Sequence, residues 1–257
     1  MDGVIMAGGS PGPDDPLYAY TQGRPKALID MNGRTMLERV VDALQASCSI
    51  EDVVVVGPGS DMDMHFQRPV HHLPDQNNLV ANALAGINWL RQQKPDTRIV
   101  FLCSADIPTI TGDIVDKFVE LCRPFDRAIY YCFATQATIE TRFPHSRRTF
   151  VKLKGLNVAG GDVALIHAEL ADSHYELWQA MTNARKHAWQ LARIVGLPML
   201  LKFLFRRVSL ADIETTAERL INRPAKIILS PYAELAMDAD KPRQVELLRN
   251  DLKRRDA

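Results

Sequence analysis

The chain has 257 residues, of which 46% are hydrophobic and 24% are charged. Its 31 lysines and arginines equal its 31 aspartates and glutamates, so no basic excess favours nucleic acid as a partner. The composition is that of a globular protein, and a chain of this length can bury a large core. The N-terminal residues lack the basic start and the cleavage site of a signal peptide, which predicts a cytoplasmic protein.

The first half of the chain alternates short apolar strands with helices. Apolar runs predict buried strands at residues 4–7, 52–56, 99–103 and 127–134. Apolar residues at helical spacing predict helices from residue 35, over 78–90 and over 112–122. Fully apolar strands that alternate with helices are typical of an α/β fold with a largely parallel sheet.

The second half is richer in helix. Strands are expected at 149–153 and 163–166, and residues 175–222 favour helix with a break at Gly196-Leu197-Pro198. A strand at 225–229 and a helix at 243–254 follow. We predict a single domain over residues 1–257, with a helical insertion at about 171–222 and a core that residues 224–257 complete.

A glycine-rich segment follows the first strand. Ala7-Gly8-Gly9 would let backbone N–H groups approach a ligand closely, and Gly23-Arg24-Pro25-Lys26 would add a point charge for a polyphosphate. A glycine-rich turn with a surface lysine explains the pattern equally well. The segment lacks the Gly-Lys-Ser/Thr of a Walker loop and the GxGxxG of dinucleotide-binding proteins.

Carboxylates stand where ligand-binding loops are expected. Asp106 follows the third strand in Ser104-Ala105-Asp106-Ile107-Pro108, and Asp238 and Asp240 precede the last helix. Ligands of parallel sheets bind beyond the carboxyl ends of the strands, and carboxylate oxygens suit Mg²⁺. Turn or N-cap aspartates are the alternative interpretation.

The order of these motifs resembles a known superfamily. The segments are Ala7-Gly8-Gly9, Pro25-Lys26-Ala27-Leu28-Ile29, Gly33-Arg34-Thr35-Met36-Leu37, Ala105-Asp106-Ile107-Pro108 and Asp238-Ala239-Asp240-Lys241-Pro242. Together they resemble the nucleotidyltransferases that include molybdenum-cofactor guanylyltransferase and related small cytidylyl- and guanylyltransferases. The resemblance covers roughly residues 1–170 and 224–257.

The resemblance implies a fold and a reaction. The fold would be a Rossmann-like three-layer α/β fold of the glycosyltransferase-A type, with a mixed, mainly parallel sheet. The reaction would be the Mg²⁺-dependent transfer of a nucleotidyl group from a nucleoside triphosphate to a small phosphorylated or hydroxyl acceptor, with release of pyrophosphate. CTP and GTP are the favoured donors, and Mn²⁺ is the alternative metal.

The resemblance also implies roles for particular residues. Lys26, Asp106 and Asp240 would be catalytic, with the two aspartates holding the metal. The nucleotide-binding residues would be Ala7, Gly8, Gly9, Arg24, Lys26 and Asn78. The loop usually carries an arginine after its glycines. Here the loop reads Gly9-Ser10-Pro11-Gly12-Pro13, and Arg24 is the candidate substitute.

The acceptor site is expected near the strand at 149–153. Arg147, Arg148 and Lys152 flank this strand and could bind an anionic acceptor. Gly161 and Asp162 lie in a segment that resembles the family's acceptor-side loop. A solvated basic strand edge explains these cations equally well.

Residues 194–207 combine an apolar run with flanking cations. The run is too short and interrupted to span a bilayer, which takes ~20 apolar residues. It fits a peripheral membrane contact, a homo-oligomer contact or a lid over the acceptor. A helix packed on the sheet is the plain alternative.

Other functions remain open from the sequence. A glycosyltransferase of the same fold would use a nucleotide-sugar, and a mid-chain Asp-x-Asp would favour it, but Ser104-Ala105-Asp106 stands there. A nucleotide-binding protein without turnover is the other alternative, which the missing loop arginine favours.

Overall fold

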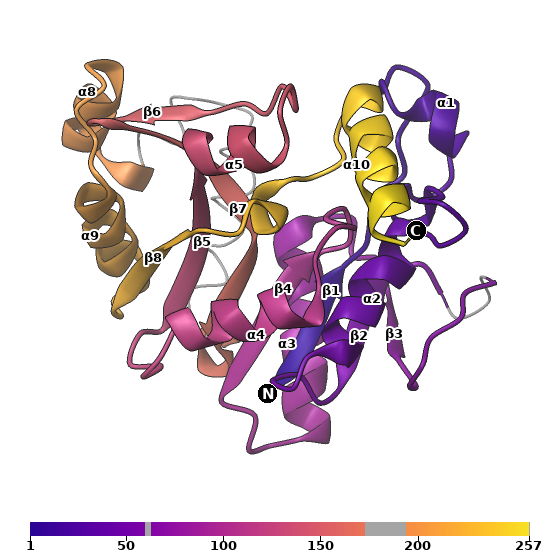
Figure 1. Ribbon diagram of the computed structural model, residues 1–257. Coiled ribbons are helices and arrows are strands. Elements are labelled where there is room, and N and C mark those ends of the chain that lie inside the picture. The colour runs from indigo at the N-terminus through magenta and orange to yellow at the C-terminus, as the bar shows by residue number, and fades with distance from the viewer. Residues whose placement is uncertain (60–62, 173–193, 257) are drawn as a thin grey trace.

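The computed structural model describes residues 1–59, 63–172 and 194–256 (Figure 1). Within these residues, eight strands form one sheet in the order β3-β2-β1-β4-β7-β5-β8, and β6 pairs with β7. The strands are β1 (Asp2–Met6), β2 (Val53–Gly57), β3 (His71–Pro74), β4 (Ile99–Ser104), β5 (Ile129–Thr135), β6 (Val151–Leu153), β7 (Leu156–His167) and β8 (Ala225–Ser230). β7 runs antiparallel to β4 and β5. β1 pairs in parallel with β2 and with β4, β2 pairs in parallel with β3, and β5 pairs in parallel with β8. The mixed, mainly parallel sheet that was predicted is therefore confirmed.

Helices cover both faces of the sheet (Figure 1). The described helices are α1 (Tyr18–Thr21), α2 (Met36–Ala46), α3 (Leu79–Gln93), α4 (Gly112–Leu121), α5 (Gln136–Arg142), α8 (Leu197–Leu204), α9 (Leu210–Ile221) and α10 (Pro242–Arg255). Short 3₁₀ turns are η1 (Lys26–Leu28), η2 (Ala168–Ala171) and η3 (Ala233–Ala236).

The alternation of side chains along the central strands creates the three layers. On β1, Ile5 packs in the cluster that contains α2 and α4, whereas Val4 packs in the cluster that contains α3. Both side chains are 0% exposed. Successive residues of a strand point to opposite faces, so a strand that is apolar throughout must be covered on both sides. The predicted three-layer α/β fold is therefore confirmed.

Local capping fixes where the helices beside the sheet begin. Thr35 and Glu38 form a capping box at the start of α2. Asn78 caps α3 by accepting hydrogen bonds from the backbone N–H groups of Val80 and Ala81. Such caps satisfy N–H groups that the first helical turn leaves without partners.

Helix α9 covers the free edge of β8. Glu214 Oε1 accepts a hydrogen bond from Ile227 N at 2.8 Å, and Glu218 Oε1 accepts one from Ala225 N at 3.2 Å. These carboxylates satisfy edge N–H groups that could otherwise pair with another chain.

The predicted helical insertion is described only in part. Helices α8 and α9 lie within it, but residues 173–193 lie outside the described residues. Figure 1 shows both helices at the β8 end of the sheet. The single-domain boundaries therefore stay a prediction. None of the described helices combines the length and the apolar character that crossing a membrane requires.

Two strands differ from the sequence expectation. β3 was not predicted, because its residues His71–Pro74 are partly exposed and do not form an apolar run. β7 extends over Leu156–His167, well beyond the strand expected at 163–166. Its glycines hid the first half of the strand, since Gly160 and Gly161 indicate a loop from sequence alone.

Gly86→Ala in α3 is expected to destabilise the fold. A Cβ at this position would lie 2.4 Å from Cγ1 of the buried Val4. Overpacking of this kind costs about 1–3 kcal/mol, whereas glycine to alanine in an open helix gains roughly 0.5–1 kcal/mol. Urea unfolding measures the sign. Asn88→Ala on the exposed side of the same helix is the control, and a more stable Gly86→Ala protein would contradict this packing.

Candidate active site

The loops after β1 and β4 lie side by side at the carboxyl edge of the sheet. The two strands pair in parallel, with Met6 in register with Ser104 at their ends. Ala105 N donates a hydrogen bond to Met6 O at 3.1 Å, which holds the second loop against the first. Ligands bind beyond the carboxyl ends of strands in such sheets, so Gly8 and Asp106 belong to one candidate site.

Two further segments reach this edge through backbone hydrogen bonds. Lys26 N donates to Gly9 O at 3.2 Å, which places η1 against the glycine loop. Ala239 N donates to Asp106 O at 3.0 Å, which places the segment before α10 against the loop after β4. The fold thus brings residues from both ends of the chain to one place.

Lys26 lies between two carboxylates that are distant from it in sequence. Its Nζ donates a hydrogen bond to Asp106 Oδ2 at 2.6 Å and another to Asp240 Oδ1. The side chains of Lys26 and Asp106 are each 18% exposed, whereas that of Asp240 is 56% exposed. The predicted catalytic residues therefore lie in direct contact.

The charges in this cluster change the pKa values of its members. Burial would lower the pKa of Lys26, but the carboxylates of Asp106 and Asp240 outweigh burial and raise it. Burial would likewise raise the pKa of Asp240, but the ammonium of Lys26 holds it below its usual range. Lys26 is therefore a permanent positive charge and Asp240 a permanent negative one.

A second ion-pair group adjoins the first. The guanidinium of Arg148 is an ion-pair partner of Asp238, lies 3.5 Å from Asp162 Oδ2 and donates to Gly160 O at 3.2 Å. Burial and the neighbouring charges of Asp106 and Asp238 raise the pKa of Asp162 well above its usual range. Arg148 was considered as an acceptor ligand from sequence, but here its charge is directed at the protein's own carboxylates.

The glycine loop is held by two residues that the sequence reasoning missed. Gly9 N donates to Asp75 Oδ2 at 3.0 Å, and Asn82 Nδ2 donates to Asp75 Oδ1 at 2.9 Å. A Cβ on Gly8 would lie 2.2 Å from Asp75 Oδ1, so any other residue there would force Asp75 to move. In the sequence, the polar run that begins at Asp75, directly after the unpredicted strand β3, could have indicated these two residues.

Two cavities meet at Asp106. A polar cavity of about 500 Å³ is bordered by the glycine loop, Lys26, Asp75 and the start of α3. A second cavity of about 430 Å³ lies between α3 and the sheet, and Asp162, Asp238 and Asp240 lie at its lining. The residues that border both are Met6, Leu79, Ser104 and Asp106. We refer to the first cavity as the polar cavity and to the second as the apolar cavity.

The other predicted site residues are placed as follows. Ala7 is buried, and its N–H donates to Val56 O at 2.8 Å. Asn78 borders the polar cavity, but its side-chain oxygen accepts two backbone N–H groups as the α3 cap, so it is already used structurally. Gly161 and Asp162 border the apolar cavity.

Two predicted residues lie away from these cavities. Arg24 is exposed, and its Nε donates to Thr21 O at 3.4 Å within its own turn. Lys152 is exposed on β6, where it pairs in register with Asn157. Neither residue borders the polar or the apolar cavity. For Lys152, the solvated strand edge is the simpler account.

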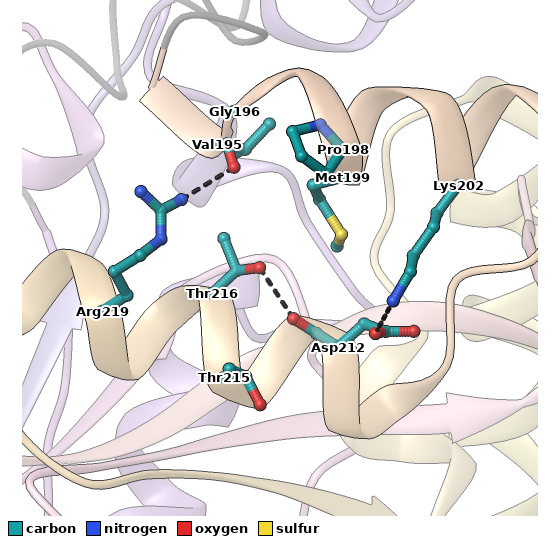
Figure 2. Close-up of a pocket in the computed structure, with 9 residues that line it drawn as sticks. All are labelled: Val195, Gly196, Pro198, Met199, Lys202, Asp212, Thr215, Thr216 and Arg219. Carbon is teal, nitrogen blue, oxygen red and sulfur yellow. Dashed lines mark hydrogen bonds and ion pairs between the residues drawn. The ribbon is translucent and has the colours of Figure 1, made fainter.

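A further cavity of about 350 Å³ lies between α8 and α9 (Figure 2). Its charged side chains are already paired. Lys202 Nζ donates to Asp212 Oδ1 at 2.5 Å, and Arg219 donates to Val195 O at 2.7 Å (Figure 2). Thr216 Oγ1 donates to Asp212 O at 2.7 Å. This cavity borders none of the clustered carboxylates and is a gap in helix packing.

A metal at the candidate active site would need ligands besides the described side chains. In the described part of the chain, no group of three or more His, Cys, Asp or Glu side chains is arranged to hold a metal ion. Asp106 and Asp240 offer hard oxygen atoms, and Mg²⁺ usually completes its coordination with water and substrate phosphates.

A glycine loop, a lysine and carboxylates at the carboxyl edge of a mostly parallel α/β sheet define a nucleotide-handling enzyme. The chain belongs to the family of MobA-like NTP transferase domains, and the family model matches residues 3–219. It is a nucleotidyltransferase. The family confirms the resemblance that the ordered motifs indicated.

Solved structures agree with this fold. A hypothetical transferase from Thermus thermophilus is 29% identical, with a TM-score of 0.80 over 95% of this chain and 98% of that one. A CMP:2-keto-3-deoxy-manno-octonic acid synthetase complexed with CTP is 10% identical, with a TM-score of 0.59 over 99% and 100%. The 2-C-methyl-D-erythritol 4-phosphate cytidylyltransferase from Thermus thermophilus is 13% identical, with a TM-score of 0.57 over 98% and 100%. The last two show a shared fold only.

Gly8→Ala is expected to weaken triphosphate binding at least tenfold, or about 1.4 kcal/mol. The new methyl group would displace Asp75, and with it the hydrogen bond that holds Gly9. Equilibrium titration with each triphosphate measures the change. Gly12→Ala is the control, because a Cβ there meets nothing within 4 Å. Equal affinities of the two variants would show that the loop does not contact the triphosphate.

Asp162→Asn is expected to stabilise the metal-free protein at neutral pH. Because the folded-state pKa of Asp162 is raised, its ionisation costs stability. That cost is absent below the ordinary carboxyl pKa and grows as the pH rises through the folded-state pKa. Urea unfolding from about pH 4 to pH 8 should therefore show a gain that increases with pH. Asp113→Asn, an exposed position of α4, is the control, and a pH-independent gain would refute this account.

Proposed function

We propose that this nucleotidyltransferase binds a nucleoside triphosphate in the polar cavity, with its phosphates against Gly8, Gly9 and Lys26. The observation that carries this proposal is the ammonium of Lys26, which lines the polar cavity and pairs with Asp240 and with Asp106, the residue at which the two cavities meet. A lysine at that point can bind phosphate oxygens, and the backbone at Gly8 permits close approach. CTP and GTP remain the favoured donors.

Asp106 and Asp240 fit the requirements of Mg²⁺, with Mn²⁺ as the alternative. Asp106 Oδ1 is buried and has no hydrogen-bond partner, which leaves a hard oxygen available for a cation. Asp240 is more exposed and lies beside it through their common contact with Lys26. The bound ion would supply neutralisation of phosphate charge.

Lys26 would stabilise the transfer electrostatically. A triphosphate in the polar cavity offers Lys26 new anionic partners in place of the carboxylates that it contacts here. Its ammonium would offset the negative charge that develops on the α-phosphate and on the departing pyrophosphate. No protein nucleophile is needed, because phosphoryl-type transfer depends on positioning and charge stabilisation. The nearby thiol of Cys103 is buried, and burial raises its pKa, so it is a poor nucleophile.

The acceptor would occupy the apolar cavity and attack the α-phosphate from the side opposite the departing pyrophosphate. Gly161 and Asp162 border that cavity and are the proposed acceptor residues. Membership of the NTP transferase family disfavours a nucleotide-sugar-dependent glycosyltransferase. The alternative of nucleotide binding without turnover is tested by pyrophosphate release below.

The contact through residues 194–207 stays a prediction. It is supported by apolar side chains of α8 and the following turn that are exposed, namely Leu197, Leu201, Phe203, Leu204 and Phe205. Arg206 and Arg207 lie beside them and are exposed. Such a surface suits either a membrane interface or a second copy of the chain.

A triphosphate with Mg²⁺ is expected to raise the unfolding temperature of the native protein. Ligand at about 100 times its Kd adds roughly 2.7 kcal/mol of stability. The shift with Mg²⁺ should be largely lost in Asp240→Asn, and comparison of the four ribonucleoside triphosphates identifies the base. Asp113→Asn is the matched control. A shift of equal size in Asp240→Asn would remove this residue from the metal site.

Asp106→Asn is expected to lower pyrophosphate release by about 10²-fold or more, by analogy with the loss of one preorganised electrostatic group. The protein should remain folded, because the amide keeps the shape of the carboxylate and Lys26 keeps Asp240 as a partner. A coupled pyrophosphate assay and circular dichroism measure the two effects. Pyrophosphate release at the native rate would exclude Asp106 from catalysis.

A further inference from the structure

The apolar cavity has two hydrocarbon walls. One wall is the face of α3 that looks toward the sheet, and the other is formed by β4, β5 and β7. Its apolar lining includes Val80, Ala83 and Ile87 on α3, and Leu102, Ile129 and Ala164 on the sheet. A cavity of about 430 Å³ is within the size range of small-molecule sites, which span about 300–1,000 Å³.

The charged end of this cavity is entirely acidic. Its charged lining residues are Asp106, Asp162, Asp238 and Asp240, and no lysine, arginine or histidine is among the described residues that border it. Lys26 borders the polar cavity instead, and Arg148 is occupied by Asp162 and Asp238. Apart from a metal at Asp106 and Asp240, an anionic molecule would therefore gain no cationic partner here and would meet the like charges of Asp162 and Asp238.

The position of the acidic end determines which part of a ligand can react. Asp106 and Ser104 border both cavities, so a molecule between α3 and the sheet has one end at the site proposed for the phosphates. Its remaining body lies against hydrocarbon, where a polar or charged group without a partner costs free energy.

We infer that the acceptor is a neutral, mainly apolar or aromatic molecule that carries a hydroxyl group. This inference rests on the proposed function and narrows its acceptor to the hydroxyl class. The hydroxyl oxygen forms a bond to the α-phosphorus, and the bond from that phosphorus to the α,β-bridging oxygen breaks. Pyrophosphate leaves with that electron pair, and the hydroxyl proton is released to solvent.

The first test is binding of 2-naphthol and of 2-naphthyl phosphate to the full chain, without nucleotide or metal. The two probes share one ring system and differ in the phosphate charge. We expect 2-naphthol to bind at least tenfold more tightly in a fluorescence titration. Equal or tighter binding of 2-naphthyl phosphate would overturn the inference.

The second test locates the probe. Ala83→Phe places a ring in the middle of the apolar cavity and should weaken 2-naphthol binding at least tenfold. Ala81→Phe makes the same change on α3 at a half-buried position that borders neither cavity, and it should bind as the native protein does. Undiminished binding to Ala83→Phe would place the probe elsewhere, such as on exposed α8, and would overturn the inference.

The triphosphate titration separates this inference from the proposed function. Ala83 does not border the polar cavity, so Ala83→Phe should keep the triphosphate-dependent rise in unfolding temperature. A triphosphate shift without specific 2-naphthol binding would retain the nucleotidyltransferase site and reject the apolar acceptor. Specific 2-naphthol binding without any triphosphate shift would reject the proposed nucleotide site.

Discussion

The contact of Lys26 with Asp106 and Asp240 is the interaction on which the candidate site depends. It joins η1, the loop after β4 and the segment before α10. A mostly buried charge without a partner costs several kcal/mol, roughly 3–5 kcal/mol when one member of a buried pair is removed. Each of these segments therefore stabilises the position of the other two, although they are widely separated along the chain.

The balance of charge around this contact is negative. The carboxylates of Asp106, Asp162, Asp238 and Asp240 face the cations Lys26 and Arg148. The raised pKa values of Asp162 and Asp238, for which burial is the largest cause, have the same origin in crowded carboxylates removed from water. Carboxylates crowded in this way cost stability when they are ionised. A divalent cation and an arriving phosphate chain would together relieve this cost, since one balances the excess charge and the other gives Lys26 new partners.

The sheet explains why two different cavities meet at this site. β1 and β4 are covered by helices, and at their ends the chain has either glycine or short side chains, which leaves room for a polar ligand. Farther along the same face, α3 does not pack fully against β5 and β7, which leaves the apolar cavity. Separately, carboxylates of α9 accept hydrogen bonds from backbone N–H groups along the outer edge of β8. The carboxylates of the candidate site and those that protect the edge thus come from different segments of the chain.

Local sequence was sufficient for the layered fold and for nominating residues that the structure brings together. Apolar strands such as residues 53–56 must be buried on both faces, and glycines or aspartates after such strands must lie at one sheet edge. These rules, together with the order of the motifs, predicted the α/β class and nominated Lys26, Asp106 and Asp240. They failed for β3, whose half-exposed residues form no apolar run, and for the first half of β7, whose glycines resemble a loop.

Tertiary structure alone decided which polar residues face the site. Asp75 and Asn82 hold the glycine loop, and Arg148 pairs with Asp238, because the pairing of β2 with β3 and of β4 with β7 brings distant segments together. Lys152 has the residue type of a ligand-binding group, but the register of β6 with β7 leaves it exposed. Sequence determines what a side chain can do through its chemistry and local period. Which partners it meets also depends on which distant strands pair, as β4 and β7 do, and no local pattern specifies that choice.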